Sequence, residues 1–175
     1  GLTLQSGRVL YDAQLAFVTR GTLNAAGDNA VLFPTYSTGT PRDPLAMVAA
    51  GRALDPERYF IVIPNLLGNG ESSSPSNHSA QRGVQFPHVS LLDNVSAQWR
   101  LLERLGVERL ALAFGWSMGA QQAYHHAALF PERVQRLLAV CGSARTSAHN
   151  VVFLEGVKAA LEADPAFAEG RYVEP

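Results

Sequence analysis

The residues best suited to chemistry form the pentapeptide Gly115-Trp-Ser-Met-Gly119. An apolar stretch ends at Phe114, and a helical pattern begins directly after Ser117. A serine on such a tight strand-to-helix turn adopts strained backbone angles, and the turn presents its hydroxyl at the carboxyl end of a sheet. The glycines remove Cβ atoms that would clash where the arms of the turn approach. The pattern predicts a nucleophile for acyl transfer, and the competing interpretation is a glycine-rich turn with an incidental serine.

A serine nucleophile needs two N–H donors for the negative charge that develops on the substrate oxygen. The backbone N–H of Met118, the residue after the serine, is the first predicted donor. The second is expected in the loop over 34–40, after the first parallel strand, where small residues let the backbone approach the site. Ser37 is the preferred position and Tyr36 the neighbouring alternative, while an ordinary connecting loop is the competing interpretation.

The elements that must position these groups alternate along the chain. Apolar runs predict strands over 29–34, 59–64, 109–114 and 133–140, and helical patterns cover 44–54, 90–105, 118–130 and 148–163. Near-continuous apolar strands separated by helices are typical of an α/β fold with a parallel, doubly wound sheet covered on both faces. Ahead of them, 2–10 and 14–22 are predicted to form an antiparallel hairpin on the edge of the sheet.

Three local signals refine this pattern. The spacing of Ser90 and Asp93 predicts a capping box at the start of a helix, and Gly106 predicts its end. The polar segment 65–89 is predicted to be a long loop. The single cysteine, Cys141, excludes an internal disulfide, and its apolar neighbours predict a buried packing residue.

Composition restricts the class of protein. The 175 residues include 14 basic and 15 acidic side chains and are 47% hydrophobic, which predicts one domain with a substantial core and no nucleic-acid surface. No apolar run approaches the roughly 18 residues of a membrane span, and no cluster has the spacing of metal ligands. Only 17% of the residues are charged, against about 25% in typical domains, so we expect something else to cover part of the surface.

Beyond the strand–serine–helix turn at Ser117, called the elbow from here on, the sequence resembles the α/β-hydrolase superfamily and, within it, the homoserine O-acetyltransferase branch. The resemblance runs across nearly the whole chain and is carried by Phe86-Pro-His-Val-Ser90, Asp93-Asn-Val-Ser-Ala-Gln98, Leu110-Ala-Leu-Ala-Phe-Gly-Trp-Ser-Met-Gly119, Phe130-Pro-Glu-Arg-Val134 and Ala144-Arg-Thr-Ser-Ala-His-Asn150. It implies that Ser117 is acylated by an ester or thioester, that the acyl group passes to an alcohol, and that the amides of Met118 and Ser37 bind the oxyanion. Acetyl-CoA would be a substrate, and no bound cofactor is implied.

The elbow differs from the Gly-Gly-Ser-Met-Gly-Gly of the acetyltransferases at two positions, Trp116 and Ala120. A bulky tryptophan beside the nucleophile changes the shape of the acyl or acceptor pocket. An esterase of the same fold, or a transferase for another alcohol, therefore stays open beside homoserine acylation.

The serine also needs a base and an acid that orients it, and in this fold both follow on loops after later strands. The sequence ends one helix after the fourth predicted strand. His125 and His126 lie about 12 Å or more along the helix from Ser117, so they are expected to be surface or interface histidines.

Of the remaining histidines, His149 is placed at the rim of the site as a weak candidate base, and solvation is expected for His78 and His88.

We therefore expect residues 1–175 to be the N-terminal, nucleophile-bearing part of a hydrolase domain. The lid, acid and histidine would come from the remainder of the polypeptide or from a second chain. The alternative is a non-catalytic chain that only binds or assembles.

The expected partners are a small-molecule acyl donor and an alcohol acceptor, with a homodimer as an expected assembly. Nucleic acid and membrane are not expected partners, and the expected location is the cytoplasm.

Overall fold

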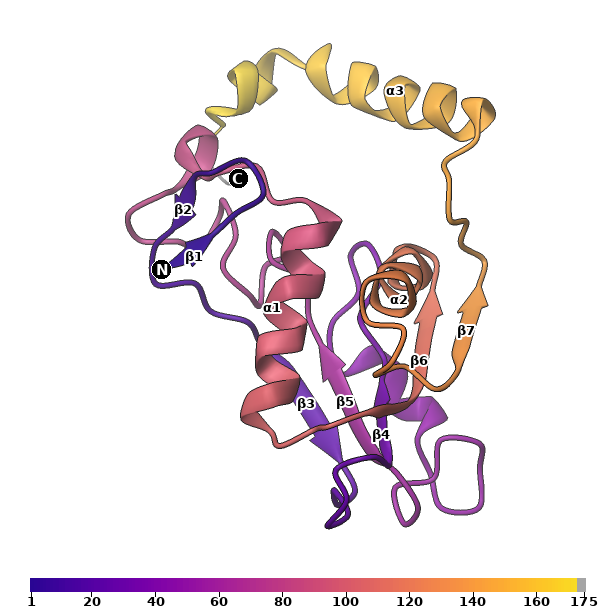
Figure 1. Cartoon of the computed structure of the whole chain (residues 1–175). Helices are drawn as coiled ribbons and strands as arrows, with labels where there is room; N and C mark the ends of the chain where they lie inside the picture. Colours follow the sequence, from indigo (N-terminus) through magenta and orange to yellow (C-terminus); the bar gives the residue numbers. More distant parts are fainter. Residues whose placement is uncertain (173–175) are drawn as a thin grey trace.

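A five-stranded sheet forms the centre of the computed structural model, which describes residues 1–172 (Figure 1). Its order is β3 (Phe17–Arg20), β5 (Phe60–Pro64), β4 (Ala30–Leu32), β6 (Leu110–Trp116) and β7 (Leu137–Val140). All neighbours pair in parallel except β3, which runs antiparallel to β5 at one edge. The predicted α/β fold with a mainly parallel sheet is therefore confirmed.

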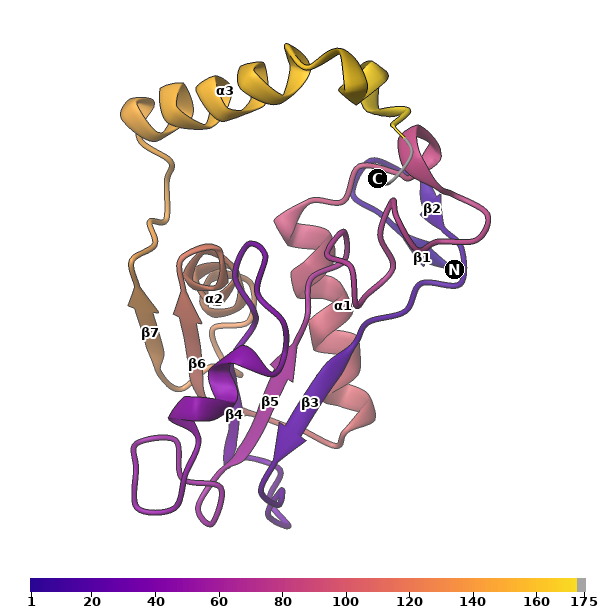
Figure 2. The same ribbon diagram turned by 180° about the vertical axis from the view of Figure 1, so that it is seen from behind.

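Both faces of the sheet are covered, which explains the near-continuous apolar strands. Because successive strand residues point to opposite faces, Leu32 packs under the helices α1 (Leu91–Arg104) and α2 (Met118–Leu129), while Val31 packs on the opposite side. Figure 1 shows α1 and α2 together in front of the sheet, and Figure 2 shows the opposite face. The core of each face is therefore formed by alternate residues of the same strands.

The predicted edge hairpin is wrong in its pairing. The first segment folds back on itself, with β1 (Leu2–Thr3) antiparallel to β2 (Val9–Leu10) in a separate two-stranded sheet. Gly7 makes this possible, because its φ is 81° and its N–H donates a hydrogen bond to the carbonyl of Leu4, which closes a tight turn inside 2–10. The second segment, β3, is then free to pair with β5.

The predicted helix over 44–54 is also wrong. Only a short 3-10 helix, η1 (Asp43–Met47), forms at its start. The chain becomes extended at Val48 (φ −98°, ψ 106°), which forms a bridge with Leu54, so the helix does not continue. Gly51 lies in the turn between them: its φ is 75°, and its N–H donates to the carboxylate of Asp55 at 2.9 Å. Two such N–H donors, from Gly51 and Glu57, hold the pKa of the Asp55 carboxyl below its usual value. The remaining predicted helices and strands form, although β7 begins later than expected.

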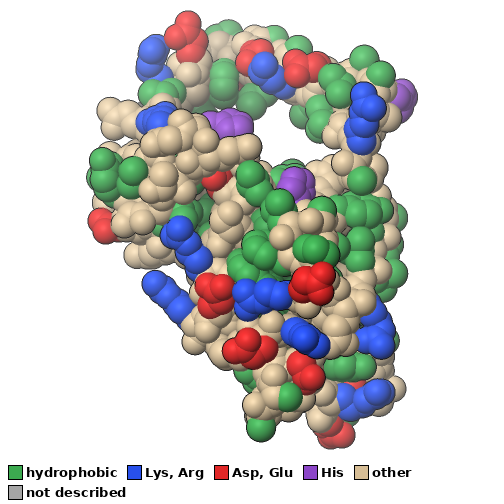
Figure 3. All heavy atoms as spheres, viewed as in Figure 1, with side chains coloured by type: hydrophobic (Ala, Val, Ile, Leu, Met, Phe, Trp, Pro, Cys, Tyr) green, Lys and Arg blue, Asp and Glu red, His purple; other side chains and the backbone are tan. Residues whose placement is uncertain are grey.

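Helix α3 (Ala148–Glu162) stands apart from the rest of the molecule. It crosses above the carboxyl end of the sheet toward the 3-10 helix η2 (Gly83–Gln85), and a gap separates it from the body (Figures 1 and 3). None of its residues is buried. Its exposed large apolar side chains are Val151, Val152, Phe153, Leu154, Val157 and Leu161. This exposure agrees with the low charged fraction of the sequence. None of the helices within residues 1–172 is long and apolar enough to cross a membrane.

The predicted capping box of α1 is confirmed and has a second use. The Ser90 hydroxyl accepts the N–H of Asp93, and the Asp93 carboxylate accepts the N–H of Ser90 at 2.8 Å. The second oxygen of the buried Asp93 accepts the N–H of Gln5 at 2.6 Å. One carboxylate thus caps the helix and ties the N-terminal segment to it.

We expect Asp93→Ala to lower the free energy of unfolding by about 1–3 kcal/mol, because it removes a helix cap and leaves the Gln5 N–H without an acceptor. Urea unfolding of the native protein measures this change. Ser96→Ala, at an exposed position of the same helix, is the matched control and should change stability little. Equal effects of the two substitutions would contradict this role of Asp93.

Candidate active site

Ser117 occupies a strained turn between β6 and α2. Its φ of 52° and ψ of −120° lie outside the regions that side-chain-bearing residues prefer, at a cost of roughly 1–3 kcal/mol. Its N–H donates to the carbonyl of Val140 at the end of β7, at 2.9 Å. Its side chain is half-buried and does not cap α2. This backbone is the strand–serine–helix turn that the sequence predicted, with the serine at the carboxyl end of the parallel strands.

Close backbone approaches explain three glycines around this turn. A Cβ on Gly115 would collide with the carbonyl oxygen of Gly119. A Cβ on Gly119 would lie 2.6 Å from the carbonyl oxygen of Pro34, and one on Gly142 would lie 2.6 Å from that of Ser117. Real Cβ atoms do not approach this closely, so each position requires glycine. The sequence pointed to the first two glycines, whereas the role of Gly142 is visible only in the structure.

The loop after β4 lies against the start of α2, as expected for a second oxyanion donor. Gly39 donates its N–H to the carbonyl of Tyr36 at 3.1 Å, and Thr38 has a φ of 64°, so 36–39 is a tight turn. Within residues 1–172, the N–H groups of Tyr36, Ser37 and Met118 have no acceptor. The choice between Ser37 and Tyr36 stays a prediction.

A chain of buried polar side chains connects this loop to the elbow. The side-chain amide of Gln122 donates to the carbonyl of Thr35 at 2.9 Å and to that of Met118 at 3.2 Å. Gln98 donates to Gln122 at 2.6 Å, and Nε2 of His126 lies 2.8 Å from Oε1 of Gln98. All three side chains are fully buried. Sequence reasoning missed the two glutamines, because the patterns of α1 and α2 do not separate a buried glutamine from an exposed one.

His126 is therefore not a surface or interface histidine, contrary to expectation. Burial, followed by the neighbouring His125, lowers the pKa of His126 to about 3. The ring is neutral at pH 7, and its Nε2 carries the proton, because Oε1 of Gln98 can only accept. Its Nδ1 is buried without a partner among the described residues.

The other histidines provide no base for the serine. His78 is buried rather than solvated: its Nε2 lies 2.7 Å from the carbonyl of Tyr11, and its Nδ1 accepts two backbone N–H groups. His88 and His149 are exposed, and His125 contacts a carbonyl of its own helix. No hydrogen bond joins Ser117 to a histidine or carboxylate in the described part of the chain.

Cys141 is exposed, so its predicted burial is wrong. It directly follows the edge strand β7 and has a φ of 54°. An apolar sequence context does not bury a residue when its strand has a neighbour on only one side.

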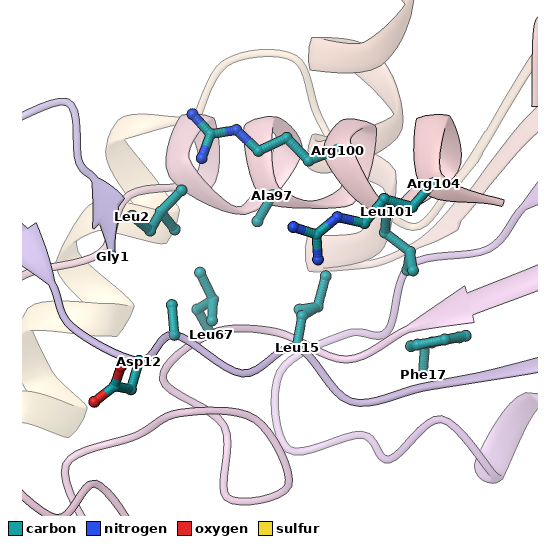
Figure 4. A pocket seen from close by; sticks show the side chains of 11 residues that line it. Gly1, Leu2, Asp12, Leu15, Phe17, Leu67, Ala97, Arg100, Leu101 and Arg104 are labelled. Atoms are coloured by element: carbon teal, nitrogen blue, oxygen red, sulfur yellow. The ribbon is translucent and has the colours of Figure 1, made fainter. Parts of the chain in front are cut away.

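Two of the cavities on the described surface lie beside α1 and α2. One, of about 330 Å³, is formed by the N-terminal segment, β3 and α1, with Arg100 and Arg104 on its helical side (Figure 4). Another, of about 370 Å³, lies between α2 and the segment after β7, and Gln121, Tyr124 and Thr146 line it. Neither is lined by Ser117.

Residues 47–173 match the family model of the alpha/beta hydrolase fold. The chain belongs to the alpha/beta hydrolase fold family. It is 44% identical to the ethyl acetate hydrolase of Pseudomonas veronii, over 98% of this chain and 50% of that protein. It is 35% identical to the homoserine O-acetyltransferase of Zymomonas mobilis, over 99% and 51% of the two chains. The expected resemblance to the acetyltransferase branch is therefore confirmed.

The fold comparison agrees. The crystal structure of an acetylester hydrolase from Corynebacterium glutamicum superposes with a TM-score of 0.95 and 39% identity, covering 99% of this chain and 51% of that chain. The chain spans about half the length of the curated relatives it matches. Those relatives are esterases and acyltransferases, so they are enzymes.

We expect His126→Gln to reduce the acid sensitivity of folding. The neutral His126 of the folded state has a pKa of about 3, whereas an unfolded histidine titrates near 6.5, so the unfolded chain binds more protons between these values. The stability that neutral His126 contributes is present above the unfolded pKa and is lost as pH falls toward 3. Glutamine can still donate to Gln98 but has no such titration.

The measurement is the free energy of unfolding of the native protein at pH 7 and at pH 4.5, for the wild type and the variant. His149→Gln, on the exposed helix α3, is the control and should keep the wild-type pH dependence. An unchanged pH dependence in His126→Gln would contradict a buried neutral imidazole.

Proposed function

We propose that this chain carries the nucleophile of a serine hydrolase that acts on small esters. Ser117 Oγ attacks the ester carbonyl carbon, and the bond to the alcohol breaks in the resulting tetrahedral intermediate. The amide of Met118 and that of Ser37 or Tyr36 stabilise its oxyanion. Water then attacks the acyl-enzyme, releasing a carboxylic acid and the free serine. The observation that carries the proposal is the strained backbone of Ser117 beside two segments with unpaired N–H groups.

Two observations favour water over an alcohol as the acceptor, although the sequence expectation put acyl transfer first. Identity is 44% to an ethyl acetate hydrolase and 35% to a homoserine O-acetyltransferase. Trp116, where the acetyltransferases have glycine, is 43% exposed directly beside Ser117, so a large apolar surface borders the reacting group. Such a surface suits a short acyl chain or a small alcohol better than a charged amino-acid acceptor.

Acyl transfer to an alcohol is the second candidate. The similarity to the acetyltransferases extends to the segment 144–150, which follows β7 beside the elbow. In that reaction the acyl-enzyme on Ser117 would be attacked by an alcohol in place of water, with an ester or acetyl-CoA as the donor.

The base and the orienting acid belong, in this proposal, to chain beyond these residues or to a second polypeptide. No described histidine or carboxylate is hydrogen-bonded to Ser117, and the chain spans half the length of its relatives. Among the described residues β7 is an edge strand, so its outer backbone groups can pair with further strands, which would also help to cover the exposed Leu137 and Leu138. A cytoplasmic location, small-molecule acyl donors and acceptors, a homodimer and the need for no bound cofactor remain part of the proposal.

We expect Ser117→Ala to abolish covalent labelling by a fluorophosphonate and to lower kcat/KM for ethyl acetate by at least about 1,000-fold. The measurement is intact mass after labelling of the complete native protein, combined with steady-state hydrolysis. Ser79→Ala, on the exposed part of the loop after β5, is the control and should keep both properties. Full activity of Ser117→Ala would overturn the proposal.

The acceptor is identified by the fate of the acetyl group of ethyl acetate in the presence of a second alcohol. For a hydrolase, acetate is the product, and its rate of release does not change as L-homoserine or n-butanol is added. For a transferase, the acetylated alcohol forms at the expense of acetate. Transfer that outpaces hydrolysis would replace the first candidate with the second.

A further inference from the structure

We propose that Gln122 is a positioning residue that holds the two oxyanion donors at a fixed separation, and that Gln98 and His126 keep its amide in the required orientation. This inference rests on the proposed function. Gln122 lies one turn into α2, below the elbow, and is fully buried. Its hydrogen bonds go to two backbone carbonyls and to Gln98 and not to the serine side chain, so it acts through the backbone.

The contacts of Gln122 reach both segments that carry the predicted donors. Its Nε2 donates to the carbonyl of Thr35, directly before Tyr36 and Ser37, at 2.9 Å. The same nitrogen donates to the carbonyl of Met118 at 3.2 Å. One side-chain amide therefore connects the loop after β4 to the first residue of α2.

The orientation of this amide is decisive. If the Gln122 side chain were flipped, its oxygen would face the carbonyls of Thr35 and Met118, and three acceptors would meet without a proton. Gln98 prevents the flip, because its Nε2 donates to Oε1 of Gln122 at 2.6 Å. Gln98 is oriented in turn by Nε2–H of His126, at 2.8 Å.

The chain of donors runs in one direction, from the imidazole through two amides to the backbone carbonyls. Every side chain in it is fully buried, so water cannot replace a lost bond cheaply. The close approach of Gly119 to the carbonyl of Pro34 brings the loop into contact with α2, but a glycine supplies no directional bond. Other directional bonds tie the loop to β5 and the segment after it, from the N–H of Thr35 to the carbonyl of Pro64 and from Asn69 to the carbonyl of Gly39. Among the described residues, the directional bond between the loop and α2 is the one from Gln122.

The test uses Gln122→Leu in the complete native protein. Leucine approximates the volume of glutamine but cannot donate to Thr35 or Met118. Removing one oxyanion donor costs about 100- to 1,000-fold in kcat, so a displaced donor should cost about 10- to 100-fold, with KM within about twofold of wild type. Affinity for phenylboronic acid, whose serine adduct places an oxygen in the oxyanion site, should fall in parallel with kcat.

His126 provides an independent pair of variants. His126→Gln can still donate to Gln98 and should keep kcat within about threefold of wild type, whereas His126→Leu should lower it about 5- to 20-fold with KM unchanged. If Gln122→Leu does not fold, the comparison of kcat between the two His126 variants tests the proposal instead. Leu102→Ala, on the side of α1 that faces the apolar core, is the stability control, because it should lower the melting temperature without changing kcat.

The outcomes separate this inference from the proposed function. Absence of fluorophosphonate labelling at Ser117 in the wild type would overturn both. A labelled, active wild type with unchanged kcat in Gln122→Leu, or in His126→Leu if the first variant does not fold, would overturn only the positioning role. A fall in kcat without a loss of affinity for phenylboronic acid would also overturn the positioning role. A fall in kcat that Leu102→Ala reproduces would do the same.

Discussion

The chain reversal at Ser117 is the constraint on which the rest of the structure depends. A serine with φ of 52° is stable only if the surroundings hold it there, and three backbone segments do so. The strand β6 leads into the turn, the end of β7 accepts the serine N–H, and the loop after β4 presses against the first turn of α2. Glycines stand at the contacts, because a single Cβ would force the segments apart.

The interface between α1, α2 and the sheet combines an apolar core with a polar chain. Trp99 stacks on Phe130 with ring centroids 4.7 Å apart, and the guanidinium of Arg133 lies 4.1 Å from the Trp99 ring centroid. Next to this apolar layer, Gln98 and Gln122 occupy positions that hydrophobic residues could fill. Buried polar groups add little net stability, but they restrict the packing to arrangements in which each donor meets an acceptor. Such a restriction is useful where backbone amides must be held in place.

Two elements, β7 and α3, expose groups of large apolar side chains. The edge strand β7 exposes two leucines, and α3 presents apolar side chains without a packing partner among the described residues. The opposite edge ends in the antiparallel strand β3, and its neighbouring loop is held by buried serines: Ser72 and Ser73 accept N–H groups of Ala16 and Gln14. Among the described residues, both β3 and β7 are edge strands, in a chain that spans half the length of its relatives.

The sequence by itself determined the parallel core of the sheet, the capping box of α1 and the strand–serine–helix turn. These features depend on local signals: apolar runs of strand length, a serine three residues before an aspartate, and glycines beside a serine. The tertiary structure alone decided that 2–10 closes on itself, that the expected helix over 44–54 ends at Met47, and that His126 is buried. It also decided the role of Gln122, because its partners Thr35 and Gln98 are distant in sequence and meet it only when α2 packs between the loop and α1. Local patterns specify what each segment prefers, whereas burial and hydrogen-bond direction depend on which segments the fold brings together.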